Sequence, residues 1–405
     1  EAAYQYAFAL RRSARPADAL RVIDEAFSSG RTSGVQADLL RLRARILREQ
    51  NRNDQALQAL FEYLPLRPAD SEAALEYVKL LFELDRYDRV VDEGPVILEE
   101  LESRGVADTS VQTQIYYVLG LSHVALKEYG QARAALNAAL LLPASDAASA
   151  DVLVPFAIYY RGWSSYRLGE YADAVEDFED LVGRYSDHPL APQTSYLAGW
   201  SYFLMNDFDD AIRSLGRVGS YETNQQLSIE ASYLLGRALA ASGSNQQAAA
   251  EFRSLYLDYP QSEFADDAWF EYGQTQAALG NTDAAVAAFD ELTNRYAGSE
   301  LASDAIFRKA ELLLGAERYP EARDAFFTYR TLYPTGIQID AALYWGGQAS
   351  AELGETAGAI LLWERLIAEN RGSPYRADAM QQAAALHFER GEYRQGKTSV
   401  VAVKA

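Results

Sequence analysis

Few side chains in this sequence are of the kinds that carry out catalysis. The chain has no cysteine, which excludes disulfides, thiolate nucleophiles and zinc–thiolate sites together. Its three histidines, His123, His188 and His387, are far apart in the sequence, so they do not suggest a metal site or a catalytic triad. No phosphate-binding glycine loop, nucleophile elbow or His-Glu-x-x-His motif occurs.

Adjacent carboxylates could in principle form the acid pair of a glycoside hydrolase. They occur at Glu99-Glu100, Asp209-Asp210 and Asp266-Asp267. In a chain whose net charge is −21, neighbouring acids are ordinary solvated charge on helix surfaces. The sequence therefore predicts a protein that is not an enzyme and that holds no metal ion and no cofactor.

Large apolar side chains are the better candidates for a functional site. Leu121, Trp163 and Trp200 occupy corresponding places in successive segments, and Tyr166 and Phe203 follow the two tryptophans by three residues. Residues three apart lie on one face of a helix, and aromatic side chains on an open face are typical anchors for a partner. The alternative is that these rings pack between neighbouring helices or against a second copy of the chain.

A second candidate site is basic. Arg41, Arg45 and Arg48 recur at i, i+4 and i+7 and so share one helical face, and Lys79 occupies the matching place in the next segment. Guanidinium groups in such a strip could receive an acidic segment or a terminal carboxylate. The alternative is a solvated arginine face that pairs with acids close in the sequence, namely Asp38, Glu49 and Asp54.

The charge of the whole chain limits the classes of partner. The 58 acidic residues outnumber the 37 basic ones, so nucleic acid and anionic membrane surfaces would be repelled. No apolar run reaches the length of a bilayer span, which predicts no membrane insertion within these residues. A protein or peptide partner remains, and the sequence leaves a homo-oligomer open.

The candidate residues belong to a repeat. A small residue recurs every 37 residues, at Ala174, Ala211, Ala248, Ala285, Ala322, Ala359 and Gly396, and less regularly before that at Ala19, Ala56, Val90 and Ala132. Another small residue lies twelve places earlier, as at Gly236, and a large apolar one four places later, as at Phe252. This spacing predicts two amphipathic helices per repeat, with small residues where the backbones approach and large ones beside them.

These positions resemble the tetratricopeptide repeat, whose consensus has small residues at positions eight and twenty and an aromatic residue at twenty-four. The resemblance implies an all-α, right-handed superhelical solenoid of about eleven helix-turn-helix repeats. In that family the first helices line a concave groove, with positions two, five, nine and twelve facing it. The aromatic and basic candidates occupy such positions, and position five carries an aromatic residue in seven successive repeats, which favours packing between helices.

The repeats predict one solenoid domain over 1–405, with weaker repeats in 1–113, regular ones in 114–370 and an incomplete one in 371–405. The third repeat departs most from the consensus, because Val78 and Val90 replace small residues and Gly94-Pro95 is expected to interrupt the second helix. Two longer spacings, around 102–114 and 143–155, predict extended loops or helix extensions.

The junctions between repeats carry a second signature, Tyr-Pro-x-Ser-x-x-Ala, complete at Tyr259 and echoed at Tyr333-Pro334 and His188-Pro189. The proline should end one helix, and Ser262 or Ser299 should cap the next. This repeat style is similar to BamD-like outer-membrane assembly lipoproteins and to the periplasmic Tol-Pal-associated coordinator, which work as scaffolds.

The resemblance implies a non-catalytic scaffold that binds a protein or peptide in its groove, in the periplasm or at the outer membrane, with a cytoplasmic adaptor as the alternative compartment. Two other roles stay open. The chain could be the helical, substrate-guiding region of a larger envelope enzyme such as a lytic transglycosylase. It could also be a self-assembling component of an envelope ring or collar.

Overall fold

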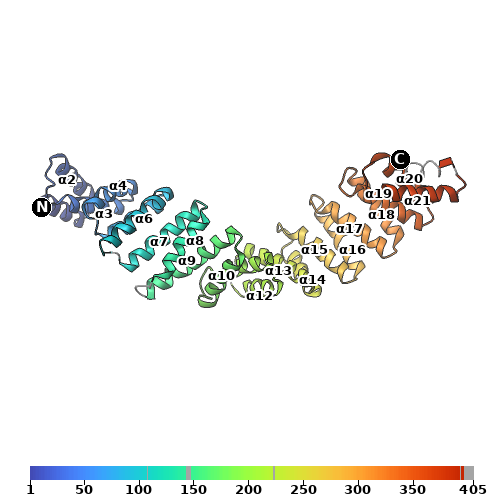
Figure 1. Ribbon diagram of the computed structural model, residues 1–405, viewed down its shortest axis with the longest axis horizontal. Helices are drawn as coiled ribbons and strands as arrows, with labels where there is room; N and C mark the ends of the chain where they lie inside the picture. Colours follow the sequence, from blue (N-terminus) through green and yellow to red (C-terminus); the bar gives the residue numbers. More distant parts are fainter. Residues whose placement is uncertain (107, 143–146, 222–223, 393, 396–405) are drawn as a thin grey trace. The chain divides into compact units, whose positions relative to one another are not determined.

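The computed structural model describes residues 1–106, 108–142, 147–221, 224–392 and 394–395, with the backbone alone for 147–151. In these residues it contains 21 α-helices, one short 3-10 helix and no strand (Figure 1). The predicted all-α class is therefore confirmed. The helices group into two compact units, residues 1–205 and 206–405, with the boundary between α11 and α12.

The first unit holds five pairs of helices and α11. Its helices are α1 (Ala2–Arg12), α2 (Pro16–Ser28), α3 (Gln36–Glu49), α4 (Asn53–Tyr63), η1 (Leu64–Leu66), α5 (Ser71–Glu83), α6 (Tyr87–Ser103), α7 (Thr109–Ala125), α8 (Tyr129–Leu141), α9 (Ala147–Leu168), α10 (Tyr171–Arg184) and α11 (Ala191–Leu204).

The second unit continues the same alternation. Its helices are α12 (Phe208–Val218), α13 (Gln225–Ala241), α14 (Asn245–Asp258), α15 (Ala265–Ala278), α16 (Thr282–Arg295), α17 (Ala302–Gly315), α18 (Tyr319–Leu332), α19 (Ile339–Glu352), α20 (Thr356–Glu369) and α21 (Arg376–Glu389). The odd-numbered helices are the first helices of the predicted repeats. Gly396, in the second helix predicted for the last repeat, lies outside the described residues.

Each helix packs mainly on its neighbours in sequence, as expected of a solenoid. First helices also contact the next first helix directly, as α5 does α7 and α7 does α9 in the first unit, and α13 does α15 in the second. The first helices of each unit therefore share one side, called here the first-helix face. The prediction that the whole chain is a single domain stays a prediction.

Glycine at position eight allows the two helices of a repeat to approach closely. A Cβ atom added at Gly236 would lie 2.6 Å from the ring of Phe252, and one at Gly273 would lie 2.7 Å from Phe289. Both rings are buried. The predicted pairing of small and large residues is therefore confirmed, and the aromatic ring of position twenty-four fills the space that the missing side chain leaves.

The contact between Gly347 and Trp363 is as close as any of these and is not expected to accommodate a further methyl group. In Gly347→Ala the new Cβ would lie 2.5 Å from Nε1 of Trp363, which donates a hydrogen bond to the carbonyl of Tyr344 at 3.0 Å. We expect the free energy of unfolding to fall by about 1–3 kcal/mol in urea titrations. Gly358→Ala is the control, because no atom lies within 4 Å of its added Cβ. An equal effect of both substitutions would contradict this account of the contact.

The third repeat does not break where the sequence suggested. Helix α6 continues through Pro95 to Ser103, so the expected interruption at Gly94-Pro95 is wrong. The side chain of Leu119 lies only 2.9 Å from a Cβ added at Gly94. The space beside Gly94, at position twenty-four of this repeat, is therefore filled by a residue of the next repeat.

The two longer spacings are accommodated chiefly by longer helices. Helices α6 and α7 have 17 residues each and α9 has 22, whereas most first helices have 14. The prediction of helix extensions is confirmed for these segments, although Pro143 itself lies outside the described residues. Pro155 is buried within α9.

At the junctions between repeats, the proline of the signature has its predicted role but the serine does not. Helix α14 ends at Asp258, just before Tyr259-Pro260, as expected. However, α15 begins at Ala265 with Phe264 as its N-cap residue, and the Ser262 hydroxyl has no hydrogen-bond partner in the described part of the chain. Ser299 accepts a hydrogen bond from the Leu301 N–H at 3.1 Å, within the turn that precedes α17. Neither serine therefore caps the helix, and of the two hydroxyls that of Ser299 orders the turn.

His188 occupies the serine place of one junction. Its N–H donates to the Tyr185 carbonyl, as the Ser262 N–H does to Tyr259, so the echo is Tyr185 to Ala191 and the expected alignment of His188-Pro189 with Tyr-Pro is wrong. The His188 ring accepts the Leu190 N–H at Nδ1 (3.2 Å) and packs edge-on against Phe156. Burial lowers the pKa of this imidazole.

This histidine should make stability depend on pH. Because its folded pKa is below the unfolded value, its neutral form stabilises the fold above about pH 6.5, and this contribution is lost as pH falls through the folded pKa. We expect wild-type Tm to fall more steeply than that of His188→Ser between neutral and mildly acidic pH. Calorimetry of the two chains measures the difference, and parallel pH profiles would contradict the prediction.

Candidate partner-binding face

The aromatic candidates lie on the first-helix face of the first unit. Trp163 and Tyr166 lie on α9, Trp200 and Phe203 on α11, and Leu121 on α7. Helices position them there because residues three apart share a face, and α7 contacts α9 directly. All five side chains are half-buried. The structure therefore places them on the predicted face and leaves part of each side chain accessible.

The α9 rings combine packing with exposure. The rings of Trp163 and Tyr166 stack with centroids 5.6 Å apart and pack beside buried Phe178. The guanidinium of Arg167 lies 5.5 Å from the centre of the Trp163 ring and 4.8 Å from that of Tyr129. Trp163 thus contributes to packing while an accessible part of its ring is available to a partner.

Trp200 lies outside the core cluster that Trp163 packs against. Its ring centroid lies 6.2 Å from that of Tyr196, one turn earlier on α11. The nearby core cluster of Phe178 and Leu197 includes partly buried Trp163 and Tyr166, but Trp200 is not part of it. Trp200 therefore has less of a packing role than Trp163 and is the stronger candidate for contact with a partner.

The basic strip is largely paired within the chain. Arg41 forms an ion pair with Glu76 at 2.5 Å, and Arg48 forms one with Glu83 at 2.6 Å. Both acids lie on the next first helix, α5, and are not the acids suggested by sequence proximity. Arg45 is exposed and forms no ion pair with another residue that the structure describes.

Lys79 and two of the nearby acids also have partners within the chain. Lys79 donates a hydrogen bond to the Gln114 side chain at 2.6 Å, and burial lowers its pKa. Glu49 pairs with Arg11 of α1, and Asp54 lies 3.8 Å from Arg86. The geometry therefore favours a strip that ties successive first helices together over one that is open to an acidic ligand.

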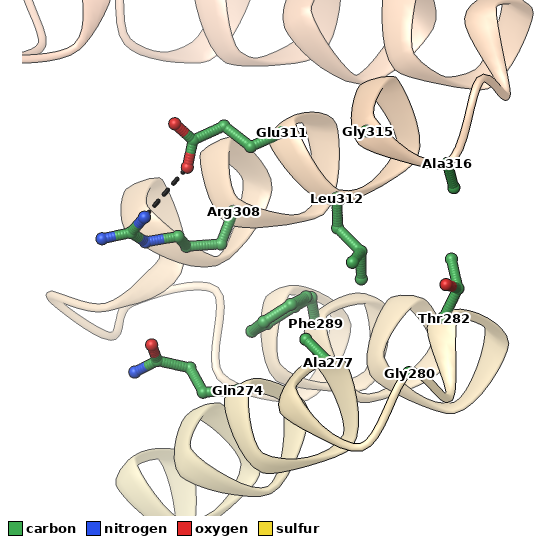
Figure 2. Close-up of a pocket in the computed structure, with 10 residues that line it drawn as sticks. All are labelled: Gln274, Ala277, Gly280, Thr282, Phe289, Arg308, Glu311, Leu312, Gly315 and Ala316. Atoms are coloured by element: carbon green, nitrogen blue, oxygen red, sulfur yellow. Dashed lines mark hydrogen bonds and ion pairs between the residues drawn. The ribbon is translucent and has the colours of Figure 1, made fainter.

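The first-helix face of the second unit contains a pocket that the sequence did not reveal. It has a volume of about 540 Å³ and lies between α15, α16 and α17. Leu312, Phe289 and Ala277 converge at its centre, with the Arg308–Glu311 ion pair at one end (Figure 2). The signal in the sequence was Ala277 at position twelve, where the repeats of α7, α9 and α11 have larger residues such as Tyr166.

The histidines have structural surroundings. His123 contacts Glu128 at 2.7 Å, and buried His387 lies between Glu364 and Glu392. Among the described residues, no three acidic or histidine side chains are grouped so as to hold a metal ion. In the same residues, no helix has both the length and the apolar character needed to cross a membrane.

Comparison with known families identifies the repeat. Residues 7–74 and 270–337 match one tetratricopeptide repeat model, and residues 113–146 match another. The chain is a tetratricopeptide-repeat protein. Residues 151–298 of this repeat protein match the family described as YfiO, outer membrane lipoprotein. No curated protein matches the sequence.

Solved structures of other repeat proteins are similar to this chain at low identity. A tetratricopeptide repeat protein from Parabacteroides merdae is 14% identical, with 62% of this chain and 92% of that chain covered and a TM-score of 0.41. The C-terminal part of a repeat-containing protein from Cytophaga hutchinsonii is 14% identical, with 75% and 98% covered and a TM-score of 0.44. PilW, a type IV pilus biogenesis factor, is 18% identical, with 56% and 98% covered and a TM-score of 0.39.

Proposed function

We propose that this repeat protein is a non-catalytic scaffold that binds a protein or peptide partner across the first-helix face of α9 and α11. The observation that carries the proposal is the half-buried state of Trp163, Tyr166, Trp200 and Phe203. Large aromatic side chains lose water-accessible surface when a partner covers them, which makes them effective anchors. The tetratricopeptide fold supports the scaffold role, since it commonly presents such faces to partners.

The compartment we propose is the bacterial envelope, in the periplasm or at the outer membrane. The match to an outer membrane lipoprotein family supports this compartment, and the matched residues of this chain, 151–298, include all four aromatic side chains. The net charge of −21 agrees with a protein partner and disfavours nucleic acid. Arg41, Arg45, Arg48 and Lys79 stay a weaker second candidate, because all but Arg45 have partners within the chain.

The test is photo-crosslinking in intact cells. A photoreactive amino acid replaces Trp200, and adducts formed on irradiation are identified by mass spectrometry. We expect one recurrent envelope protein. A matched site at Leu141, which is 75% exposed on the second helix α8, should not capture it. Adducts with the chain itself would instead indicate self-assembly, and the same adducts at both sites would contradict a specific face.

A further inference from the structure

The first-helix face of the second unit combines an apolar pocket with an excess of carboxylates. We propose that the face formed by α13, α15 and α17 binds a basic segment of a partner protein, whose apolar side chain enters the pocket between α15 and α17. This site is formed by the second unit alone. It does not rest on the aromatic face of α9 and α11, so the two proposals can fail independently.

The pocket has the size and lining of a side-chain site. Its volume of about 540 Å³ falls within the usual range for ligand pockets, about 300–1,000 Å³. Leu312, Phe289 and Ala277 form an apolar centre, and Gln274 and Glu311 bring polar groups to one end (Figure 2). Such a combination binds an apolar side chain and leaves hydrogen-bonding groups for the backbone beside it.

The helices beside the pocket carry uncompensated negative charge. Helices α13 and α15, which contact each other, hold four acids, Glu230, Asp266, Asp267 and Glu271, against one arginine, Arg237. Burial, and then the neighbouring charge of Asp267, raise the pKa of the Tyr233 hydroxyl on α13. On α17, which completes the face, Arg308 pairs with Glu311 at 3.0 Å. The carboxylates of α13 and α15 therefore outnumber the cation beside them, and a cation from a partner would add favourable charge interactions.

Burial makes two of these carboxylates sensitive to such a cation. It raises the pKa of both Asp267 and Glu271, and the neighbouring charge of Asp266 raises that of Asp267 further. Arg237 acts in the opposite direction on both groups. A lysine or arginine placed beside them would relieve part of the cost of holding these charges away from water.

The carboxylates and the pocket lie on one face. Glu271 and Gln274 are three residues apart on α15, about one helical turn. A basic side chain of the partner that pairs with Glu271 would therefore lie close to the partner's apolar side chain in the pocket. The partner that fits is a segment with basic residues next to a leucine-sized side chain. Nucleic acid and anionic lipid do not fit, because this face repels their phosphates.

The experiment uses the full chain and a fluorescein-labelled, lysine-rich peptide with one central leucine. Two companion peptides replace the leucine by serine or the lysines by glutamate. Fluorescence anisotropy at low and at physiological salt gives the Kd of each. We expect the leucine peptide to bind most tightly, the serine peptide more weakly and the glutamate peptide not at all, with binding weakened by salt.

Matched variants locate the site. Asp267→Asn with Glu271→Gln should weaken binding about tenfold and reduce its salt dependence. The control, Asp209→Asn with Asp258→Asn, removes the same charge from exposed positions on the second helices α12 and α14 and should change Kd little. Ala277→Leu fills the pocket and should lower affinity for the leucine peptide to that for the serine peptide, with salt dependence unchanged.

Three outcomes would overturn the proposal. The first is that no peptide binds. The second is equal weakening by the two charge-removing double variants, because binding would then follow total charge. The third is equal affinity of wild type for the leucine and serine peptides, because the pocket would then take no part. Circular dichroism of each variant confirms that the helices are retained.

Discussion

Phe326→Ala is expected to lower the free energy of unfolding by about 3–5 kcal/mol. The Phe326 side chain has no exposed surface and packs edge-on against Phe307 in the core of the second unit. Its removal loses the transfer free energy of the ring and leaves a cavity, because the small residue Ala310 at position eight cannot fill the space. Equilibrium urea unfolding followed by circular dichroism measures the change.

The adjacent residue supplies the control. Phe327 is 58% exposed and contacts the guanidinium of Arg330 across 5.7 Å. Phe327→Ala removes the same atoms one position along α18, and we expect it to cost less than about 1 kcal/mol. If the two substitutions were equally destabilising, position twenty-four would not be the central packing position of the repeat.

The second large effect concerns binding. Trp163→Ala combined with Trp200→Ala should weaken the complex with the partner captured at Trp200 about 1,000-fold, because each buried aromatic anchor commonly contributes about 2 kcal/mol. Helical content should stay near that of the wild type, although Tm should fall because Trp163 packs beside Phe178. Isothermal titration of the purified partner into each chain gives the affinity.

An aromatic residue away from this face is the comparison. Phe61 is 50% exposed on the second helix α4, so Phe61→Ala should leave the affinity unchanged. If the double tryptophan variant kept its affinity, the two indoles would be packing residues only. If it lost helical content in proportion to binding, the loss would reflect unfolding and would not support the proposed face.

The regular parts of the fold could be predicted because they depend on local periodicity. The small and large residues at positions eight and twenty-four, such as Gly236 and Phe252, meet in the structure as their spacing indicates. The break expected in the third repeat was wrong, because α6 continues through Pro95 and because Leu119 of the next repeat packs against Gly94. Sequence inspection treated each position separately and therefore placed a break where the helix continues.

The candidate site was predicted less completely. The face of Trp163 and Trp200 follows from helix periodicity, but their half-buried state depends on how closely neighbouring helices approach. The partners of Arg41 and Arg48 were missed because long side chains reach across to the next first helix, to Glu76 and Glu83. A pocket is harder still to predict, because it is a space left by residues from three helices.

The ion pairs between first helices have a mechanical consequence. Arg11–Glu49, Arg41–Glu76 and Arg48–Glu83 each join one first helix to the next in the first unit, so any bending that spreads this face must lengthen them. Salt weakens such partly exposed pairs but not the apolar contacts within each repeat. We therefore expect the first helices of these repeats to spread apart more easily as ionic strength rises, while the packing within each repeat is unchanged.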